Sequence, residues 1–187
     1  MPTIPAPPLR RVYAVVGPSG AGKDTLLALA LARRPDLRPV RRVITRPAEA
    51  GGEEFEGVDA AEFARRRDAG EFALHWRAHG LCYGLPAAAF AAGGTPVFNG
   101  SRGMLRAAAA AFPGLRVIHV TAPADVLARR LTARGRESGE EIRRRLDRAV
   151  LPLPPGLDVA VVENGGGLEP ALAAFLGALW PGPVPVA

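Results

Sequence analysis

The sequence predicts an α/β domain in which a mostly parallel sheet is flanked by helices. Short apolar runs rich in β-branched residues alternate along the chain with segments of helical character. A glycine-spaced loop joins the first apolar run to the first helical segment. The chain has 187 residues, of which 48% are hydrophobic, so it is near the size of one domain and apolar enough to bury a core. In such folds ligands bind at the carboxyl ends of the strands.

The strand and helix segments follow from composition and from residues that end an element. We expect strands over 12–16, 40–44, 72–76, 97–98, 115–120 and 159–162. We expect helices over 25–34, 60–69, 87–92, 102–112, 123–134, 139–149 and 169–179. Gly17 ends the first strand, and Pro35 stops the first helix because proline cannot continue it. Asp59 can cap the second helix, which Gly70 ends. Residues 45–57 read as a polar stretch that contains glycine.

The two ends of the chain lack periodicity and are rich in proline. We therefore expect loose tails over 1–9 and 181–187 and a single domain over 10–180. No run approaches the roughly 20 apolar residues that span a bilayer, and the first residues do not resemble a secretory signal. Cys82 is the only cysteine, which excludes an internal disulfide and a cysteine-based zinc site. We expect a cytoplasmic protein with no membrane partner.

The chain carries a formal net charge of +6, which favours an anionic partner. Aromatic residues make up only 6%, and no basic run is interleaved with aromatic residues, so nucleic acid is not the expected partner. Lys23 is the only lysine among 24 basic residues. In a chain so biased to arginine, this lysine marks a position where a compact ammonium fits and a broad guanidinium does not.

The segment Gly17-Pro-Ser-Gly-Ala-Gly-Lys23 matches the spacing of a phosphate-binding loop. Its glycines can turn successive N–H groups toward a phosphate at a helix N-terminus, and Lys23 would reach the β- and γ-phosphates of ATP. The alternative is an ordinary glycine turn, which the lone lysine disfavours. We expect ATP to bind to the following residues: Gly17, Pro18, Ser19, Gly20, Ala21, Gly22, Lys23, Asp24 and Thr25.

The residue after the lysine departs from this motif, which normally has Ser or Thr there to contact Mg²⁺. Here Asp24 stands in that position and Thr25 follows. Asp24 can bind Mg²⁺ as an oxygen ligand, directly or through water. The alternative is a carboxylate placed at a helix N-terminus by the helix dipole.

Several segments together resemble the guanylate-kinase-like P-loop kinases. They are GPSGAGKD, ITRP, GEF, HGLCYG, VFNGSR and RLTARGRES…IRRRL, within residues 12–165. GAGKD, ITRPA and VFNGSR make the chain most similar to the ribose 1,5-bisphosphate phosphokinase family. The resemblance implies a P-loop kinase fold with an acceptor-binding insertion at about 40–92 and a lid at about 130–145.

The acceptor region departs from guanylate kinase in the residues that would read a base. Counting from GEF and YG, the positions that contact guanine in that family fall on Leu74 and Leu85, which cannot do so. Arg46 of ITRP and Tyr83 of CYG remain as groups suited to a phosphate ester. Asn99 and Arg102, at a strand's carboxyl end, complete the expected substrate-binding set; a helix-start arginine facing solvent is the alternative for Arg102. A phosphorylated sugar fits this pattern better than a nucleotide.

The resemblance implies transfer of the γ-phosphoryl of ATP to ribose 1,5-bisphosphate, giving 5-phosphoribosyl 1-diphosphate and ADP with Mg²⁺ as cofactor. The nucleophile is an ionised phosphate oxygen, so no general base is needed. Lys23 and the lid arginines Arg130, Arg134 and Arg145 are the expected catalytic groups. The alternative for the arginines is a set of solvated charges on helix faces.

Two other functions remain open at this point. One is a nucleoside monophosphate kinase with altered base choice, and the other is a non-catalytic phospho-ligand-binding module. The intact Lys23 loop disfavours the second, because a scaffold does not need ATP. A coupled assay of ADP release across acceptors separates the two kinases.

Overall fold

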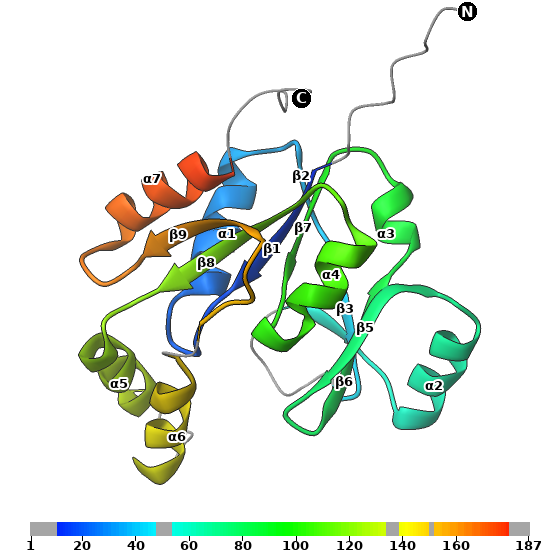
Figure 1. Ribbon diagram of the computed structural model, residues 1–187, viewed down its shortest axis with the longest axis horizontal. Helices are drawn as coiled ribbons and strands as arrows, with labels where there is room; N and C mark the ends of the chain where they lie inside the picture. The colour runs from blue at the N-terminus through cyan, green and yellow to red at the C-terminus, as the bar shows by residue number, and fades with distance from the viewer. Residues whose placement is uncertain (1–10, 48–53, 134–138, 150–151, 180–187) are drawn as a thin grey trace, which may run out of the picture.

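The computed structural model describes residues 11–47, 54–133, 139–149 and 152–179, without the side chains of 141, 142, 145, 148 and 149 in the last of its arginine-rich helices. The central sheet has five parallel strands (Figure 1). In spatial order they are β2 (Leu37–Pro39), β7 (Thr95–Asn99), β1 (Val12–Val16), β8 (Leu115–Thr121) and β9 (Asp158–Glu163). Thus β1 lies in the middle, and its carboxyl end opens into the glycine loop.

A second sheet of four strands stands beside the first. Its order is β4 (Phe55–Gly57), β3 (Arg42–Ile44), β6 (Leu81–Pro86) and β5 (Phe72–Ala78). The β3–β4 pair is parallel, whereas β6 is antiparallel to both β3 and β5. This sheet lies within the region expected to bind the acceptor.

Helices cover both faces of the central sheet. On one face α1 (Lys23–Arg33) and α7 (Leu168–Ala178) enclose a core that includes Val15, Ile118 and Phe175. On the other, η2 (Arg102–Met104) and α4 (Leu105–Ala111) enclose a core that includes Val16 and Phe98. The second sheet is flanked by α2 (Ala60–Asp68), and α3 (Ala88–Ala91) precedes β7.

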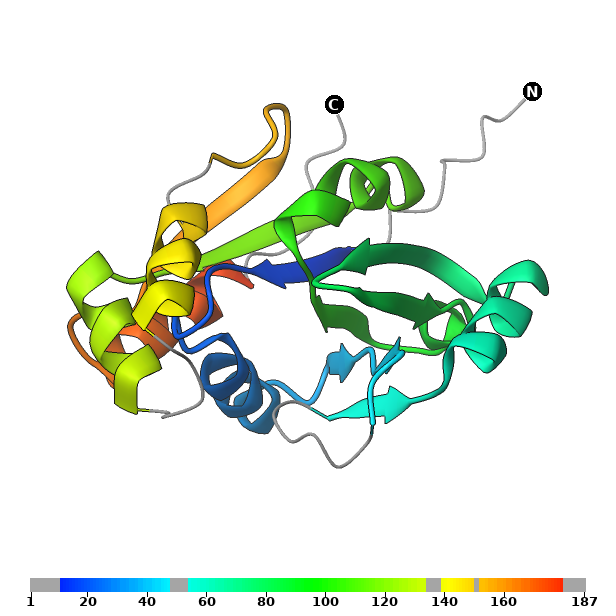
Figure 2. The ribbon, with the colours of Figure 1, turned by 90° about the horizontal axis from the view of Figure 1, so that it is seen from below.

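Two more helices, α5 (Ala124–Ala133) and α6 (Gly139–Ala149), form a pair beyond the carboxyl end of β8. Figure 2 shows this pair and the second sheet on opposite sides of β1 and α1. The glycine loop therefore lies between the part expected to act as a lid and the part expected to bind the acceptor.

The sequence predicted the central strands and the helices to within a few residues, and the N-cap is confirmed: the Glu62 amide donates to Asp59 Oδ1 at 2.7 Å. The expected strand over 40–44 is confirmed over Arg42–Ile44, which form β3. The edge strand β2 precedes it, belongs to the other sheet and was not predicted, and the Val40 amide between the two strands donates to Val97 O. The polar stretch up to Gly57 contains β4, and β6 was not predicted. The tails over 1–9 and 181–187 lie outside the described residues. Within the described ranges, no helix is both long and apolar enough to cross a membrane.

Candidate active site

The glycine loop is held in place by close contacts with the ends of β8 and β9. Gly17 has φ +149°, and a Cβ atom there would lie 2.0 Å from the carbonyl oxygen of Val120. Gly22 has φ +86°, and a Cβ there would lie 2.3 Å from Asn164 Nδ2. That amide donates to the carbonyl of Ala21 at 2.8 Å. Only glycine fits these two positions, and the loop is thereby fixed at the start of α1.

Lys23 curls back over this loop. Its Nζ donates to the carbonyls of Gly17 and Pro18, both at 2.9 Å. The ammonium is therefore held above the hollow of the loop, next to the N-terminus of an 11-residue helix. A hollow lined by backbone N–H groups, with a helix N-terminus and an ammonium, is a binding site for phosphate groups.

Asp24 and Asn99 meet across the carboxyl end of the sheet. Asn99 Nδ2, at the end of β7, donates to Asp24 Oδ1 at 2.8 Å. In the part of the chain that the structure describes, no three His, Cys, Asp or Glu side chains gather as metal ligands. One carboxylate beside a phosphate-binding loop fits Mg²⁺, which is usually held by one or two carboxylates together with substrate phosphates and water.

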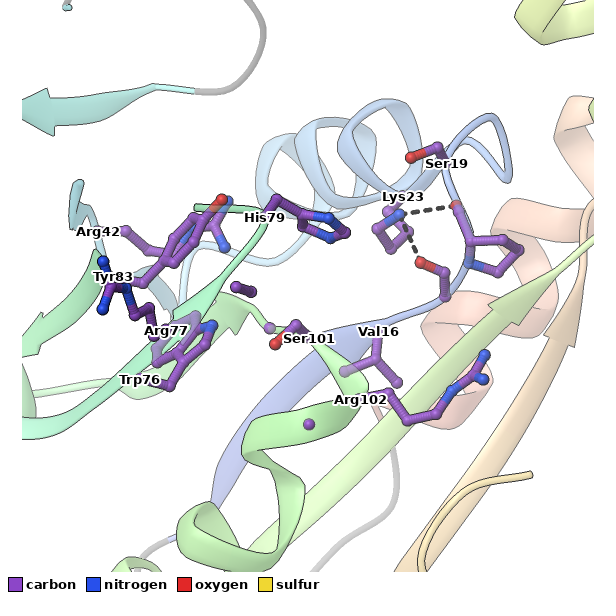
Figure 3. Close-up of a pocket in the computed structure, with 15 residues that line it drawn as sticks. Val16, Ser19, Lys23, Arg42, Trp76, Arg77, His79, Tyr83, Ser101 and Arg102 are labelled. Carbon is purple, nitrogen blue, oxygen red and sulfur yellow. Dashed lines mark hydrogen bonds between the residues drawn. The ribbon is translucent and has the colours of Figure 1, made fainter. Parts of the chain in front are cut away.

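A cavity of about 530 Å³ connects the loop with the second sheet (Figure 3). Its lining residues are Val16, Gly17, Pro18, Ser19, Lys23, Arg42, Trp76, Arg77, Ala78, His79, Tyr83, Gly100, Ser101, Arg102 and Gly103. Figure 3 shows Lys23 and the loop at one end, and Arg42, Trp76 and Tyr83 at the other. The cavity therefore runs from a phosphate-binding loop to a cationic, aromatic wall.

That wall is a stack of three side chains. The rings of Trp76 and Tyr83 lie 5.2 Å apart and 7° from parallel, and Arg42 Cζ lies 5.1 Å from the centre of the Tyr83 ring. Burial lowers the pKa of Arg42 to about 10, while Tyr83 and Asp24 oppose this shift. Arg42 therefore remains a cation at neutral pH.

Two further polar atoms belong to this lining. Trp76 Nε1 and Ser101 Oγ are buried and have no hydrogen-bond partner among the described residues. Buried polar atoms are almost always hydrogen-bonded. The indole N–H and the hydroxyl are therefore donors on cavity-lining residues that a polar ligand or water can use.

Basic groups also gather at the loop end of the cavity. Arg102 contributes to the lining, and its partial burial lowers its pKa. The pKa of His119 is lowered by burial first and then by the charges of Arg102 and Lys23. The imidazole of His119 is therefore neutral at pH 7, and the nearby cations Arg102 and Lys23 are the groups suited to bind an anion.

A smaller hollow lies on the other side of the loop. It is lined by Gly20, Gly22, Thr25, Arg130, Ala133, Asn164 and Leu168. One N–H of the Arg130 guanidinium donates to the carbonyl of Gly20 at 3.2 Å, which ties α5 to the loop. Arg134 lies outside the described residues. Arg145 belongs to α6, but its side chain is not among those that the structure describes.

The predicted residues fall into groups. Those that line the main cavity are Gly17, Pro18, Ser19, Lys23, Tyr83 and Arg102. Those that line the smaller hollow are Gly20, Gly22, Thr25 and Arg130, and Asp24 and Asn99 contact each other at the carboxyl end of the sheet. The Arg46 guanidinium lies 5.2 Å from the Phe55 ring and is not part of the lining. Leu74 and Leu85 pair across β5 and β6 and are buried in the core, so neither offers a polar contact.

Sequence reasoning missed Arg42 and Trp76. The signal for both was the pairing of β6 with its neighbours, since Trp76 is opposite Tyr83 and β3 also pairs with β6. Without β6, neither residue could be assigned to the same wall as Tyr83.

The fold and the phosphate-binding loop define a P-loop kinase of the guanylate-kinase-like type. A solved guanylate kinase from Anaplasma phagocytophilum has the same fold, with a TM-score of 0.67 and 18% identity over 92% of this chain and 85% of that one. No family model matches the chain.

Curated relatives give the narrower family. The chain is 49% identical to a ribose 1,5-bisphosphate phosphokinase PhnN from Agrobacterium fabrum, over 84% of this chain and 89% of that protein. It is also 49% identical to the protein of the same name from Ruegeria sp., over 92% of this chain and 93% of that one. The chain belongs to the ribose 1,5-bisphosphate phosphokinase family, and the resemblance read from the sequence is confirmed.

Proposed function

We propose that this protein transfers the γ-phosphoryl of ATP to the 1-phosphate of ribose 1,5-bisphosphate and releases ADP and 5-phosphoribosyl 1-diphosphate. Membership of the family supports the reaction. The observation that carries it in the structure is a cavity that joins the Lys23 loop to a wall with an arginine and two aromatic side chains. The two positions that would contact guanine, Leu74 and Leu85, are buried leucines.

The chemistry asks little of the protein beyond alignment. An ionised oxygen of the 1-phosphate forms a bond with the γ-phosphorus, and the bond from that phosphorus to the β–γ bridging oxygen breaks, with its electron pair leaving on ADP. No proton has to be removed from the acceptor, so no general base is needed. Lys23 offsets the charge that develops on the β- and γ-phosphate oxygens. Arg102, which lines the same cavity, is the group proposed to contact the acceptor's 1-phosphate.

Mg²⁺ would be held by Asp24, with the Asn99 amide orienting that carboxylate. When bound, it supplies positive charge to the phosphate oxygens of ATP. Thr25, at the smaller hollow, is a further oxygen group near the loop.

The α5–α6 pair is suited to act as a lid. Arg130 already contacts the loop, and Arg134 and Arg145 are the other arginines proposed to reach the phosphates. Closure would exclude water and so limit hydrolysis of ATP. The substrates are small molecules, and the cytoplasm, where ATP and phosphorylated sugars are available, is the proposed location.

The product identifies the reaction. ³¹P NMR of the protein incubated with ATP, Mg²⁺ and ribose 1,5-bisphosphate should show the 1-phosphate signal replaced by the two coupled signals of a sugar diphosphate. The Lys23→Ala variant is the matched control and should show little conversion. Release of inorganic phosphate with no sugar diphosphate would contradict the proposal.

A further inference from the structure

We propose that Arg42, on the stack with Tyr83 and Trp76, binds the 5-phosphate of the acceptor, which is the phosphate that does not react. Arg42 would thereby make the enzyme selective for a sugar that carries phosphates at both ends. This inference rests on the proposed function and assigns a role to a residue that the reaction itself does not require.

The cations of the main cavity lie at two ends. Lys23 and Arg102 are at the loop end, where phosphoryl transfer takes place, and Arg42 belongs to the wall contributed by the second sheet (Figure 3). A ligand with one phosphate would satisfy only one of these ends. A sugar bisphosphate that places its 1-phosphate at the loop carries its second dianion toward the other end, where Arg42 and Arg77 line the cavity and Arg42 is the less exposed of the two.

The contact with Tyr83 restrains Arg42 beside the cavity. Its Cζ lies 5.1 Å from the Tyr83 ring centre, and Trp76 is stacked on the same ring at 5.2 Å. A guanidinium carries its N–H donors in its plane. A phosphate accepts hydrogen bonds from these donors, often two at once.

Burial adds a reason for this arginine to prefer an anion. The pKa of Arg42 is lowered because its charged form has lost water. A dianionic phosphate that enters the cavity stabilises that charge, and the interaction is stronger in a partly desolvated site than at the surface.

Arg46 is the residue that the sequence pattern favoured for this role, and its position differs. Its guanidinium lies over Phe55 at 5.2 Å, outside the cavity lining. Both arginines are partly buried and both lie over an aromatic ring, so they differ chiefly in whether they face the cavity. This makes Arg46 an informative comparison for Arg42.

The test compares two acceptors that differ only in the 5-phosphate. We would measure kcat/KM for ribose 1,5-bisphosphate and for ribose 1-phosphate in the wild type and in Arg42→Met, Arg42→Lys, Arg46→Met and Arg41→Met. Methionine keeps an unbranched stem of similar length. Arg41 is the matched control, because it is next in the chain but its guanidinium donates to the carbonyl of Phe55 and does not line the cavity.

Arg42→Met should lower kcat/KM on the order of 30-fold for the bisphosphate, as expected for one charge-assisted contact, and by less than about threefold for ribose 1-phosphate. Arg42→Lys should fall between the wild type and Arg42→Met, because it keeps the charge and loses the fork. Arg41→Met should keep the wild-type ratio of the two acceptors.

Two results would overturn the inference. One is an equal loss of kcat/KM for both acceptors in the Arg42 variants. The other is an Arg46→Met variant that loses more of the preference for the bisphosphate than Arg42→Met does. If Arg42→Met does not fold, as judged by its melting curve, the ratio in Arg42→Lys decides the question. A wild type that releases ADP with neither acceptor would contradict the proposed function instead, so the two failures are distinguishable.

Discussion

The surroundings of Lys23 explain why a chain with so many arginines has a lysine at this position. Its ammonium lies 2.9 Å from two carbonyl oxygens of the loop, Gly17 O and Pro18 O, which curve around it. Three short N–H donors on a compact head fit this hollow, and the planar fork of arginine is too broad for it. On the proposed function, the same head would contact the transferred phosphate oxygens.

Replacing Lys23 should therefore reduce catalysis. We expect Lys23→Ala to lower kcat by about 100-fold, because it removes a charge that stabilises the transferring phosphoryl group. Lys23→Arg should also be poor. Steady-state ADP release at saturating substrates measures the effect, and activity within about twofold of the wild type would show that the loop does not bind the transferred phosphate.

Asp24 and Asn99 form the second residue-scale unit. The usual phosphate-loop motif has a hydroxyl after the lysine, whereas this chain has Asp24 there and an amide, Asn99, at the end of β7. The 2.8 Å hydrogen bond between Asn99 and Asp24 shows that the two side chains meet. Exchange of the two groups can therefore keep one carboxylate in the same small volume.

Asp24→Asn should raise the Mg²⁺ concentration for half-maximal rate much more than Asn99→Ala does, since only Asp24 supplies a charged oxygen ligand. Asp24→Asn combined with Asn99→Asp should recover part of the loss. Magnesium titrations of the rate, together with calorimetry of ADP binding with and without Mg²⁺, provide the measurement. An unchanged Mg²⁺ dependence in Asp24→Asn would mean that Asp24 serves only the N-terminus of α1.

At the scale of elements, strand β8 places His119 near the cations Lys23 and Arg102. His119 pairs with Val16 on one side and Val161 on the other, so its backbone lies beside the end of β1. Its pKa lies below the ordinary value of 6.5, because burial and then Arg102 and Lys23 disfavour the imidazolium. The folded protein therefore keeps this ring neutral at pH values where an unfolded chain protonates it.

The sign of the resulting pH dependence is fixed. The unfolded state binds a proton as the pH falls through about 6.5 and the folded state does not, so His119 makes the fold less stable toward acid. The slope of the unfolding free energy against pH is at most about 1.4 kcal/mol per pH unit for this one group.

His119→Asn should reduce the fall in melting temperature between pH 7.5 and 5.5 by a few degrees. The carboxylates with lowered pKa, Asp36, Glu62 and Asp68, lose their contribution only below about pH 4.5. An unchanged fall in the variant would contradict this account.

The sequence was a good guide where an element is local and less so where it depends on pairing. The loop and α1 follow from contiguous glycines, a lysine and a helical run. In contrast, β2 contains Pro39 and stands at the edge of the central sheet, where proline is tolerated. Its three residues are too few to be recognised in the sequence as a strand separate from β3. The segment of β6 has no clean alternation of apolar and polar residues, because it is stabilised by neighbours on both sides.

The same limit explains which site residues could be foreseen. Lys23, Asp24 and Tyr83 stand in recognisable segments, whereas Arg42 and Trp76 join Tyr83 only through pairing across three strands. Arg46 fitted the sequence pattern, yet its side chain turns to Phe55. A motif locates a segment of chain, and tertiary packing decides which of its side chains reaches the cavity.

On the scale of the whole molecule, the fold separates three tasks. The central sheet and α1 hold the phosphate-binding loop, the second sheet supplies the acceptor wall, and the α5–α6 pair stands on the opposite side of the loop (Figure 2). Acceptor choice is thus confined to one part of the structure. Leu74 and Leu85 are buried in the core there, so on the proposed function the wall would recognise phosphate and sugar groups and not a purine.

The central claim is therefore acceptor choice, and a direct comparison tests it. ADP release should be measured at saturating ATP and Mg²⁺ with ribose 1,5-bisphosphate and with GMP over a range of concentrations. We expect kcat/KM for the sugar bisphosphate to exceed that for GMP by at least about 100-fold, a difference of two or more charge-assisted contacts. A higher kcat/KM with GMP would contradict the account and make the protein a nucleoside monophosphate kinase.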